Sequence, residues 1–139
     1  MIDTTRSDAV SLIRRYYERF NAQDIDGFLD LLTDDVVHDL SQGPREIGKP
    51  AFRRFLEHMN RCYHERARDI VIMVDDTGTH AAAEFQLDGN YLVTDGDLPP
   101  ARGQGYVLTV GAFFEIRDGK ISRVSNNYNF QDWLRQVKT

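Results

Sequence analysis

The chain has 139 residues, a formal net charge of −5, and 41% hydrophobic and 28% charged residues. This length fits a single domain, and the composition is that of a globular protein with its own core. The acidic balance argues against nucleic acid binding, which needs a basic face, and against a polybasic patch for a membrane surface.

The cysteine, histidine and apolar content argues against a disulfide-bonded, secreted, membrane-spanning or metal-binding protein. The single cysteine, Cys62, rules out an internal disulfide and fits a reducing compartment. The N-terminal residues lack the apolar segment of a signal peptide, and no apolar run reaches the roughly 20 residues of a transmembrane helix. The four histidines show no metal-ligand spacing, and no glycine-rich phosphate loop occurs. We therefore expect a cytoplasmic protein, folded as one domain over residues 1–139, with no metal and no cofactor.

The first half of the chain is predicted to be mainly helical. Apolar residues at helical spacing predict a helix over residues 7–22. Asp24 can cap a second, short helix that buries apolar residues as far as Leu32. The β-branched residues of 36–40 predict a strand, and Pro50 lies in the first turn of a third helix, where its missing N–H costs nothing.

The second half changes to a period of two, which is typical of strands. A polar, proline-rich loop interrupts it, and a short terminal segment that carries Trp133 is predicted to be helical. The predicted strands are 70–74, which has apolar residues on both faces, 81–87, 105–117 and 121–130. Helices followed by long antiparallel strands indicate an α+β domain. A strongly curved, mainly antiparallel sheet with three helices on one side encloses a cone, and the mouth of that cone is a natural ligand pocket.

One pair of residues suggests a chemistry. Tyr16 lies on the first predicted helix, and Asp39 lies at the end of the first predicted strand. A phenol donor and a carboxylate base in an apolar pocket can move protons on carbon acids. Two plainer readings stay open: Asp39 as a solvated strand-end carboxylate, and Tyr16 as a core residue with its hydroxyl at a rim.

Asparagines on the last predicted strand are also unusual, because asparagine is depleted in sheets. Either Asn126 or Asn127 can point into the cone and hydrogen-bond a ligand, or the strand frays toward an edge. Asn127 shares a face with Ser125, and Asn126 shares the opposite face with Tyr128. The sequence leaves open which of these faces lines the pocket.

Four segments carry a resemblance to a known family: RRYYERFNAQDIDGFLDLLTDD at residues 14–35, VVHDLSQGPREIGKPAFRRF at 36–55, GAFFEIRDGKISRV at 111–124 and NNYNFQDWLRQV at 126–137. With these segments the chain resembles the ketosteroid isomerase-related, SnoaL-like branch of the nuclear transport factor 2-like superfamily. The resemblance implies the cone fold. It leaves the chemistry open, because this fold supports several activities as well as non-catalytic modules.

The resemblance also implies roles for single residues. Tyr16 stands where the isomerases keep an oxyanion-hole tyrosine, and Asp39 where they keep a general base. Their second oxyanion donor, a protonated carboxylic acid, aligns with Gly111, which has no donor. Leu32 and Leu56 stand where some members have supporting tyrosines. Activity as a steroid isomerase is therefore not expected.

The segment before Asp39 is one residue shorter than the isomerase pattern. A slip of one residue turns a strand side chain to the opposite face, so either Asp39 or His38 can face the pocket. We expect His38, Phe55 and Phe113 to contact the ligand, together with the two asparagines.

The resemblance implies a small hydrophobic organic ligand. It also implies a cofactor-free isomerisation, dehydration or cyclisation, with Asp39 as the base and Tyr16 polarising an oxygen. The alternative is a non-catalytic ligand-binding or dimerisation module of the same fold. An ionisable group inside an apolar cavity favours the enzyme, and a cavity filled by aromatic side chains favours the module.

We further expect a homodimer through the outer face of the sheet, because a monomer would leave much apolar surface exposed to water. On the long strand that contains Gly111, two alternating sets of side chains can face outward. They are either Val107, Thr109 and Phe113, or Tyr106, Leu108, Val110 and Phe114.

Overall fold

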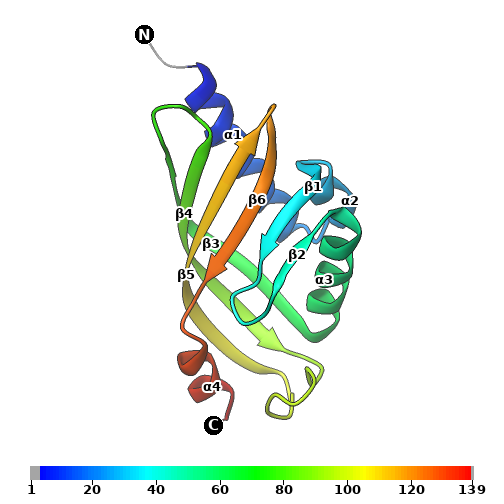
Figure 1. Ribbon diagram of the computed structural model, residues 1–139. Coiled ribbons are helices and arrows are strands. Elements are labelled where there is room, and N and C mark those ends of the chain that lie inside the picture. Colours follow the sequence, from blue (N-terminus) through cyan, green and yellow to red (C-terminus); the bar gives the residue numbers. More distant parts are fainter. Residues whose placement is uncertain (1–3, 139) are drawn as a thin grey trace.

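The computed structural model describes residues 4–138 and consists of a single curved sheet with helices packed against it (Figure 1). The six strands lie in the order β2-β1-β6-β5-β4-β3, and the sheet is not closed. The elements are α1 (Thr4–Asn21), α2 (Ile25–Leu29), β1 (Leu32–Asp39), β2 (Arg45–Ile47), α3 (Lys49–Cys62), β3 (Tyr63–Val74), β4 (His80–Tyr91), β5 (Gln104–Arg117), β6 (Lys120–Asn127) and α4 (Phe130–Lys138). This is the predicted α+β cone. Within the described chain no helix is long and apolar enough to cross a bilayer.

Both helices predicted at the start of the chain are present, with different boundaries: α1 spans Thr4–Asn21, where 7–22 was expected. Asp24 caps α2 as expected, since its Oδ1 accepts the backbone N–H of Gly27 at 2.9 Å. The second helix, however, ends at Leu29, and Leu32 is the first residue of β1. The reason is sheet pairing: the Ile121 N–H donates to the Leu31 carbonyl at 2.9 Å, which draws the chain into the sheet beside β6.

The parallel pairing of β1 with β6 joins the first strand to the last. Strands β3 to β6 form an antiparallel meander, and β1 and β2 extend the sheet beyond β6. The short strand β2 was not predicted, because three residues show no alternation. Strand β6 ends at Asn127, before the predicted end at 130. Helix α4 begins at Phe130, and the Asn129 Oδ1 atom just before it accepts the backbone N–H of Asp132 at 3.0 Å.

Alternation along β5 decides which face of the sheet is covered. One set of side chains is buried against the helices, and Val107 and Phe113 are 47% and 51% exposed on the opposite face. The first of the two predicted outward sets is therefore the one that faces away from α1. On β3 the same alternation leaves Val71 and Met73 more than half exposed, so within one chain this strand is covered on one face only, although both of its faces are apolar. Helix α1 runs behind the sheet in Figure 1, while α3 lies beside β1 and β2.

Candidate functional site

A cavity of about 610 Å³ lies between the inner face of the sheet and the helices. Its size is in the range of pockets that bind small organic molecules. Most of its lining is aromatic or aliphatic, with polar groups at a few places. Apolar lining residues include Phe20, Phe55, Phe85, Leu108, Val110 and Trp133.

His38 is the member of the His38–Asp39 pair that faces the cavity. Its ring stacks on Phe52 with centroids 4.1 Å apart and meets the edge of Phe55 at 4.6 Å. Only 2% of the residue is exposed, and its Nδ1 atom is buried without a hydrogen-bond partner. Burial lowers the pKa of His38 from 6.5 to about 4, and the nearby charge of Asp39 opposes this fall only in part. His38 is therefore neutral at pH 7.

Tyr16 projects from α1 into the same cavity. Its ring is held by Phe28 at 4.5 Å and by Phe114 at 5.1 Å between centroids. Burial raises the pKa of the Tyr16 hydroxyl far above its usual value, and a hydrogen bond with the Asn126 side chain opposes the rise. Tyr16 thus stays protonated, so it can donate a hydrogen bond but cannot act as a base at neutral pH. Asn126 is the asparagine of β6 that lines the cavity.

The cavity also contains a carboxylate that sequence reasoning missed. Glu65 lies on β3 and accepts a hydrogen bond from the Tyr106 hydroxyl at 2.6 Å. Burial raises the pKa of Glu65, and the Tyr106 hydrogen bond opposes that rise. On β4, Gly89 pairs with Tyr106, and a β-carbon at this glycine would overlap the tyrosine ring. The absence of a side chain at Gly89 therefore lets Tyr106 lie flat over β4 and reach Glu65.

The pattern of β3 explains why Glu65 was missed. Tyr63, Glu65 and Ala67 share the inner face, which would have indicated an inward carboxylate. The period breaks at Asp69, whose φ is +54°, within a register shift between Arg68 and Val71. Because of this bulge, the alternation of 70–74 could not be extended back to Glu65.

Asp39 faces the other way, and this corrects the expectation of a base in an apolar pocket. Its carboxylate accepts hydrogen bonds from Arg45 at 2.6 Å and from Arg123 at 2.8 Å. These partners hold the pKa of Asp39 below its usual value, with Arg45 the largest cause. A carboxylate stabilised as an anion in this way is a weak base.

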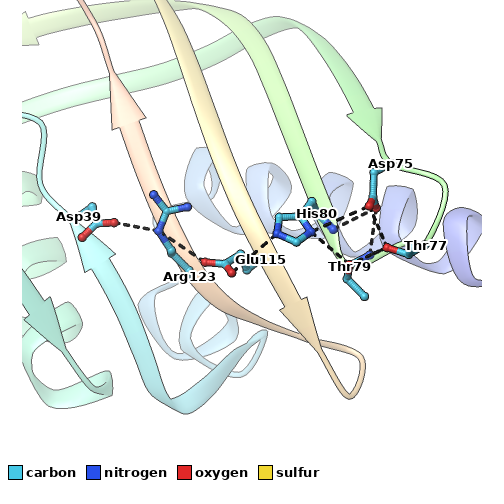
Figure 2. A network of polar contacts seen from close by, with 7 residues as sticks. All are labelled: Asp39, Asp75, Thr77, Thr79, His80, Glu115 and Arg123. Carbon is cyan, nitrogen blue, oxygen red and sulfur yellow. Dashed lines mark hydrogen bonds and ion pairs between the residues drawn. The ribbon is translucent and has the colours of Figure 1, made fainter.

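Asp39 belongs to a network of polar contacts that crosses the outer face of the sheet (Figure 2). Arg123 on β6 lies 3.6 Å from Glu115 on β5, and Glu115 lies 3.8 Å from His80 on β4. His80 in turn lies 3.9 Å from Asp75, in the turn between β3 and β4. The surroundings of Asp39 are therefore those of an outer-face ion pair.

The alternation of inward and outward side chains along β5 and β6 corrects three other expectations. Asn127 is exposed and contacts Ser125 and the Gly111 carbonyl on the outer face. Phe113 is half-exposed on that face as well, so neither side chain lines the cavity. Gly111 pairs with Asn127 on β6, so a side chain at this position would point to the outer face. Its neighbour Val110 lines the cavity and has no donor.

Comparison with known proteins finds solved structures with the same fold and a similar sequence. The profile of the SnoaL-like domain matches residues 13–124. A crystal structure from Xanthomonas campestris pv. campestris, of a protein proposed to be a polyketide cyclase, is 53% identical, with a TM-score of 0.93 over 96% of this chain and 98% of that one. A second such protein, from Pseudomonas putida KT2440, is 54% identical, with a TM-score of 0.91 over 93% and 97% of the two chains. A third, from Silicibacter sp. TM1040, is 45% identical, with a TM-score of 0.92 over 94% and 96%. None of the curated proteins matches this chain.

Proposed function

The chain belongs to the SnoaL-like family, and we propose that it binds a hydrophobic organic molecule in the cavity and catalyses a cofactor-free proton transfer on it. The observation that carries this proposal is an ionisable group with a raised pKa, Glu65, inside a mostly apolar cavity of about 610 Å³. A carboxylate whose pKa moves toward the working pH is suited to general base catalysis. The solved relatives proposed to be polyketide cyclases favour a substrate with several carbonyl groups.

The proposed reaction needs no other reagent. Glu65 removes a proton from a carbon next to a carbonyl, and the electron pair of the C–H bond forms an enolate. In a cyclisation, the enolate carbon attacks a second carbonyl of the same molecule, and the resulting alkoxide takes the proton back. In an isomerisation, the proton returns to a different carbon. Both routes conserve the proton and change no oxidation state of the protein.

The other polar groups of the cavity have proposed roles in this reaction. Tyr16 donates a hydrogen bond to the enolate oxygen, and Asn126 holds the phenol in place and is a further donor for that oxygen. His38, which is neutral, forms part of the cavity wall beside the substrate. Phe55 contacts the apolar part of the molecule.

The assembly and location of the protein are proposals too. We expect a homodimer through the outer sheet face, where the large apolar side chains Val71, Met73, Val107 and Phe113 are each about half exposed. We further propose that residues 1–139 form one domain and that the protein works in the cytoplasm, where its free thiol Cys62 stays reduced.

Exchange of a carbon-bound proton tests the function. The bicyclic ketone 2-tetralone is a suitable probe, because it is apolar, fits the cavity volume and carries acidic protons next to its carbonyl. We expect the protein to accelerate the exchange of these protons with D2O, followed by proton NMR. Glu65→Gln should lower the rate at least about 100-fold, the lower range of general base contributions, while tetralone still quenches the fluorescence of Trp133 in the cavity.

Asp39→Asn is the matched control, since it removes a carboxylate from the outer face. It should keep the wild-type exchange rate. If Glu65→Gln exchanges as fast as the wild type, Glu65 is not the base. If the wild type binds tetralone and related ketones but exchanges no proton faster than buffer, the chain is the non-catalytic ligand-binding module.

A further inference from the structure

Three metal-ligating side chains meet at the C-terminal end of α3. His58 and Cys62 lie one helical turn apart, and Asp95 reaches them from the loop that follows β4. One donor atom of each residue lies within 4.8 Å of the other two. The His58 Nε2 atom is 2.8 Å from the Asp95 Oδ1 atom and 4.0 Å from the Cys62 sulfur. The sequence alone could not join Asp95 to the other two residues.

The loop that carries Asp95 is fixed to the helix end by other contacts. The backbone N–H groups of Leu92 and Val93 donate to the Cys62 carbonyl at 2.8 and 3.2 Å. The Asp95 N–H donates to the Tyr91 hydroxyl at 2.9 Å. The Tyr63 hydroxyl donates to the Asp95 Oδ2 atom at 2.8 Å, which leaves Oδ1 toward His58. The three donors are therefore held together by the fold.

We propose that His58, Cys62 and Asp95 bind a zinc ion. Imidazole, thiolate and carboxylate form a ligand set typical of Zn²⁺, and a thiolate disfavours Mg²⁺ and Ca²⁺. Bond lengths of about 2.0 Å to nitrogen and oxygen and about 2.3 Å to sulfur give tetrahedral donor separations of about 3.3–3.6 Å. The separations of 2.8 and 4.0 Å from His58 lie on either side of that range, and Asp95 and Cys62 lie within 4.8 Å of each other. Side-chain shifts of about 0.5 to 1.3 Å therefore complete the geometry.

The surroundings agree with a site that keeps one open position. Three protein ligands leave the fourth to water or to a bound molecule, and Asp95 lines the cavity described above. The Tyr63 hydroxyl orients the Asp95 carboxylate, as outer contacts of metal ligands commonly do. The Arg61 guanidinium lies 3.0 Å from the His58 Nδ1 atom on the exposed side of the helix. When zinc binds Nε2, the neutral ring carries its proton on Nδ1, so Arg61 must turn away into solvent.

Cobalt tests the site without reference to any activity. The full-length protein is reduced, stripped with a chelator and titrated with Co²⁺ alone. We expect one equivalent to produce a thiolate-to-cobalt charge-transfer band and the intense visible bands of a tetrahedral site, and one equivalent of Zn²⁺ to abolish both. Cys62→Ser should remove the charge-transfer band, and His58→Gln, at a half-exposed position, should weaken cobalt binding more than 10-fold.

His64→Gln is the matched control, because His64 is exposed on β3, two residues beyond Cys62. It should leave the cobalt spectrum unchanged, and Tyr63→Phe should weaken binding about 10-fold through the loss of an outer contact. A wild type without a charge-transfer band at one equivalent overturns the proposal. So does a Cys62→Ser protein, folded by circular dichroism, whose spectrum matches the wild type. Loss of the bands in His64→Gln would assign them to surface histidines, which also overturns it.

Discussion

Burial of His38 makes the stability of the protein depend on pH in a way that can be calculated. The folded state holds the pKa of His38 at about 4, against 6.5 for an unperturbed histidine. Between these values the unfolded chain binds a proton that the folded chain does not. The contribution of the neutral His38 ring to the free energy of unfolding is therefore fully present above pH 6.5 and is lost as the pH falls toward 4. The side chain is only 2% exposed, so solvent screens little of the effect.

The size of the effect follows from the two pKa values. One pKa unit corresponds to about 1.4 kcal/mol, so the full difference amounts to about 3 kcal/mol below pH 4. By pH 5 about 2 kcal/mol is already lost. The interval above pH 5 is the useful one, because carboxylates with lowered pKa values, such as Asp39 and Asp88, add their own losses at lower pH.

His38→Phe isolates this contribution. It keeps an aromatic ring against Phe52, and it removes both the titrating group and the buried Nδ1 that lacks a partner. We expect the variant to be at least as stable as the wild type near neutral pH. Urea unfolding at about pH 7.5 and about pH 5 should show a wild-type loss larger than the variant's by about 2 kcal/mol. The exposed His64→Gln should behave as the wild type. If wild type and His38→Phe lose the same free energy, His38 is not buried and neutral in solution.

Three further outcomes follow from the same structure. Gly89→Ala should destabilise the protein by about 1–3 kcal/mol in urea, since its methyl group overlaps the buried Tyr106 ring, and an unchanged midpoint would contradict this packing. Phe113→Lys should convert a dimer into a monomer of 16.0 kDa by light scattering at micromolar concentration, while a wild type that is already monomeric would refute the dimer. The conjugation of a β,γ-unsaturated steroid ketone should not proceed at a rate near that of dedicated isomerases. The loss of one oxyanion donor costs about 2.7–4 kcal/mol, and Val110 supplies none at the inner face; a comparable rate would show that another side chain takes that place.

Local patterns were sufficient for most of the fold. The helical spacing of α1, the cap at Asp24 and the strict alternation of β5 each fix an element by themselves. Features that depend on distant pairing were not accessible. Leu32 joins the sheet only because Ile121 pairs with it, and the three residues of β2 form a strand only because β1 lies beside them.

The candidate site was predictable in part for the same reason. Residue type and family position identified Tyr16 and Phe55 as pocket residues. For two further pocket residues the sequence left a choice between neighbours, His38 or Asp39 and Asn126 or Asn127, and His38 and Asn126 line the cavity. The bulge at Asp69 hid Glu65, because it breaks the alternation from which an inward carboxylate would have been recognised. Tyr106 could not be joined to Glu65 from the sequence, since β4 lies between their strands.

The register of the sheet connects the corrections to one another. Asp39 pairs with Ser125 on β6, and Ser125 pairs with Phe113 on β5, so the three residues form one row across the sheet. Because directly paired residues share a face, a row must lie wholly inside or wholly outside the cone. Phe113 is exposed and Asp39 lies among arginines, so this row is outside and the row of His38 is inside. The cavity carboxylates therefore come from other parts of the chain, Glu65 from β3 and Asp95 from the loop after β4. The fold can thus hold a base in the cavity while Asp39 forms ion pairs on the outer face.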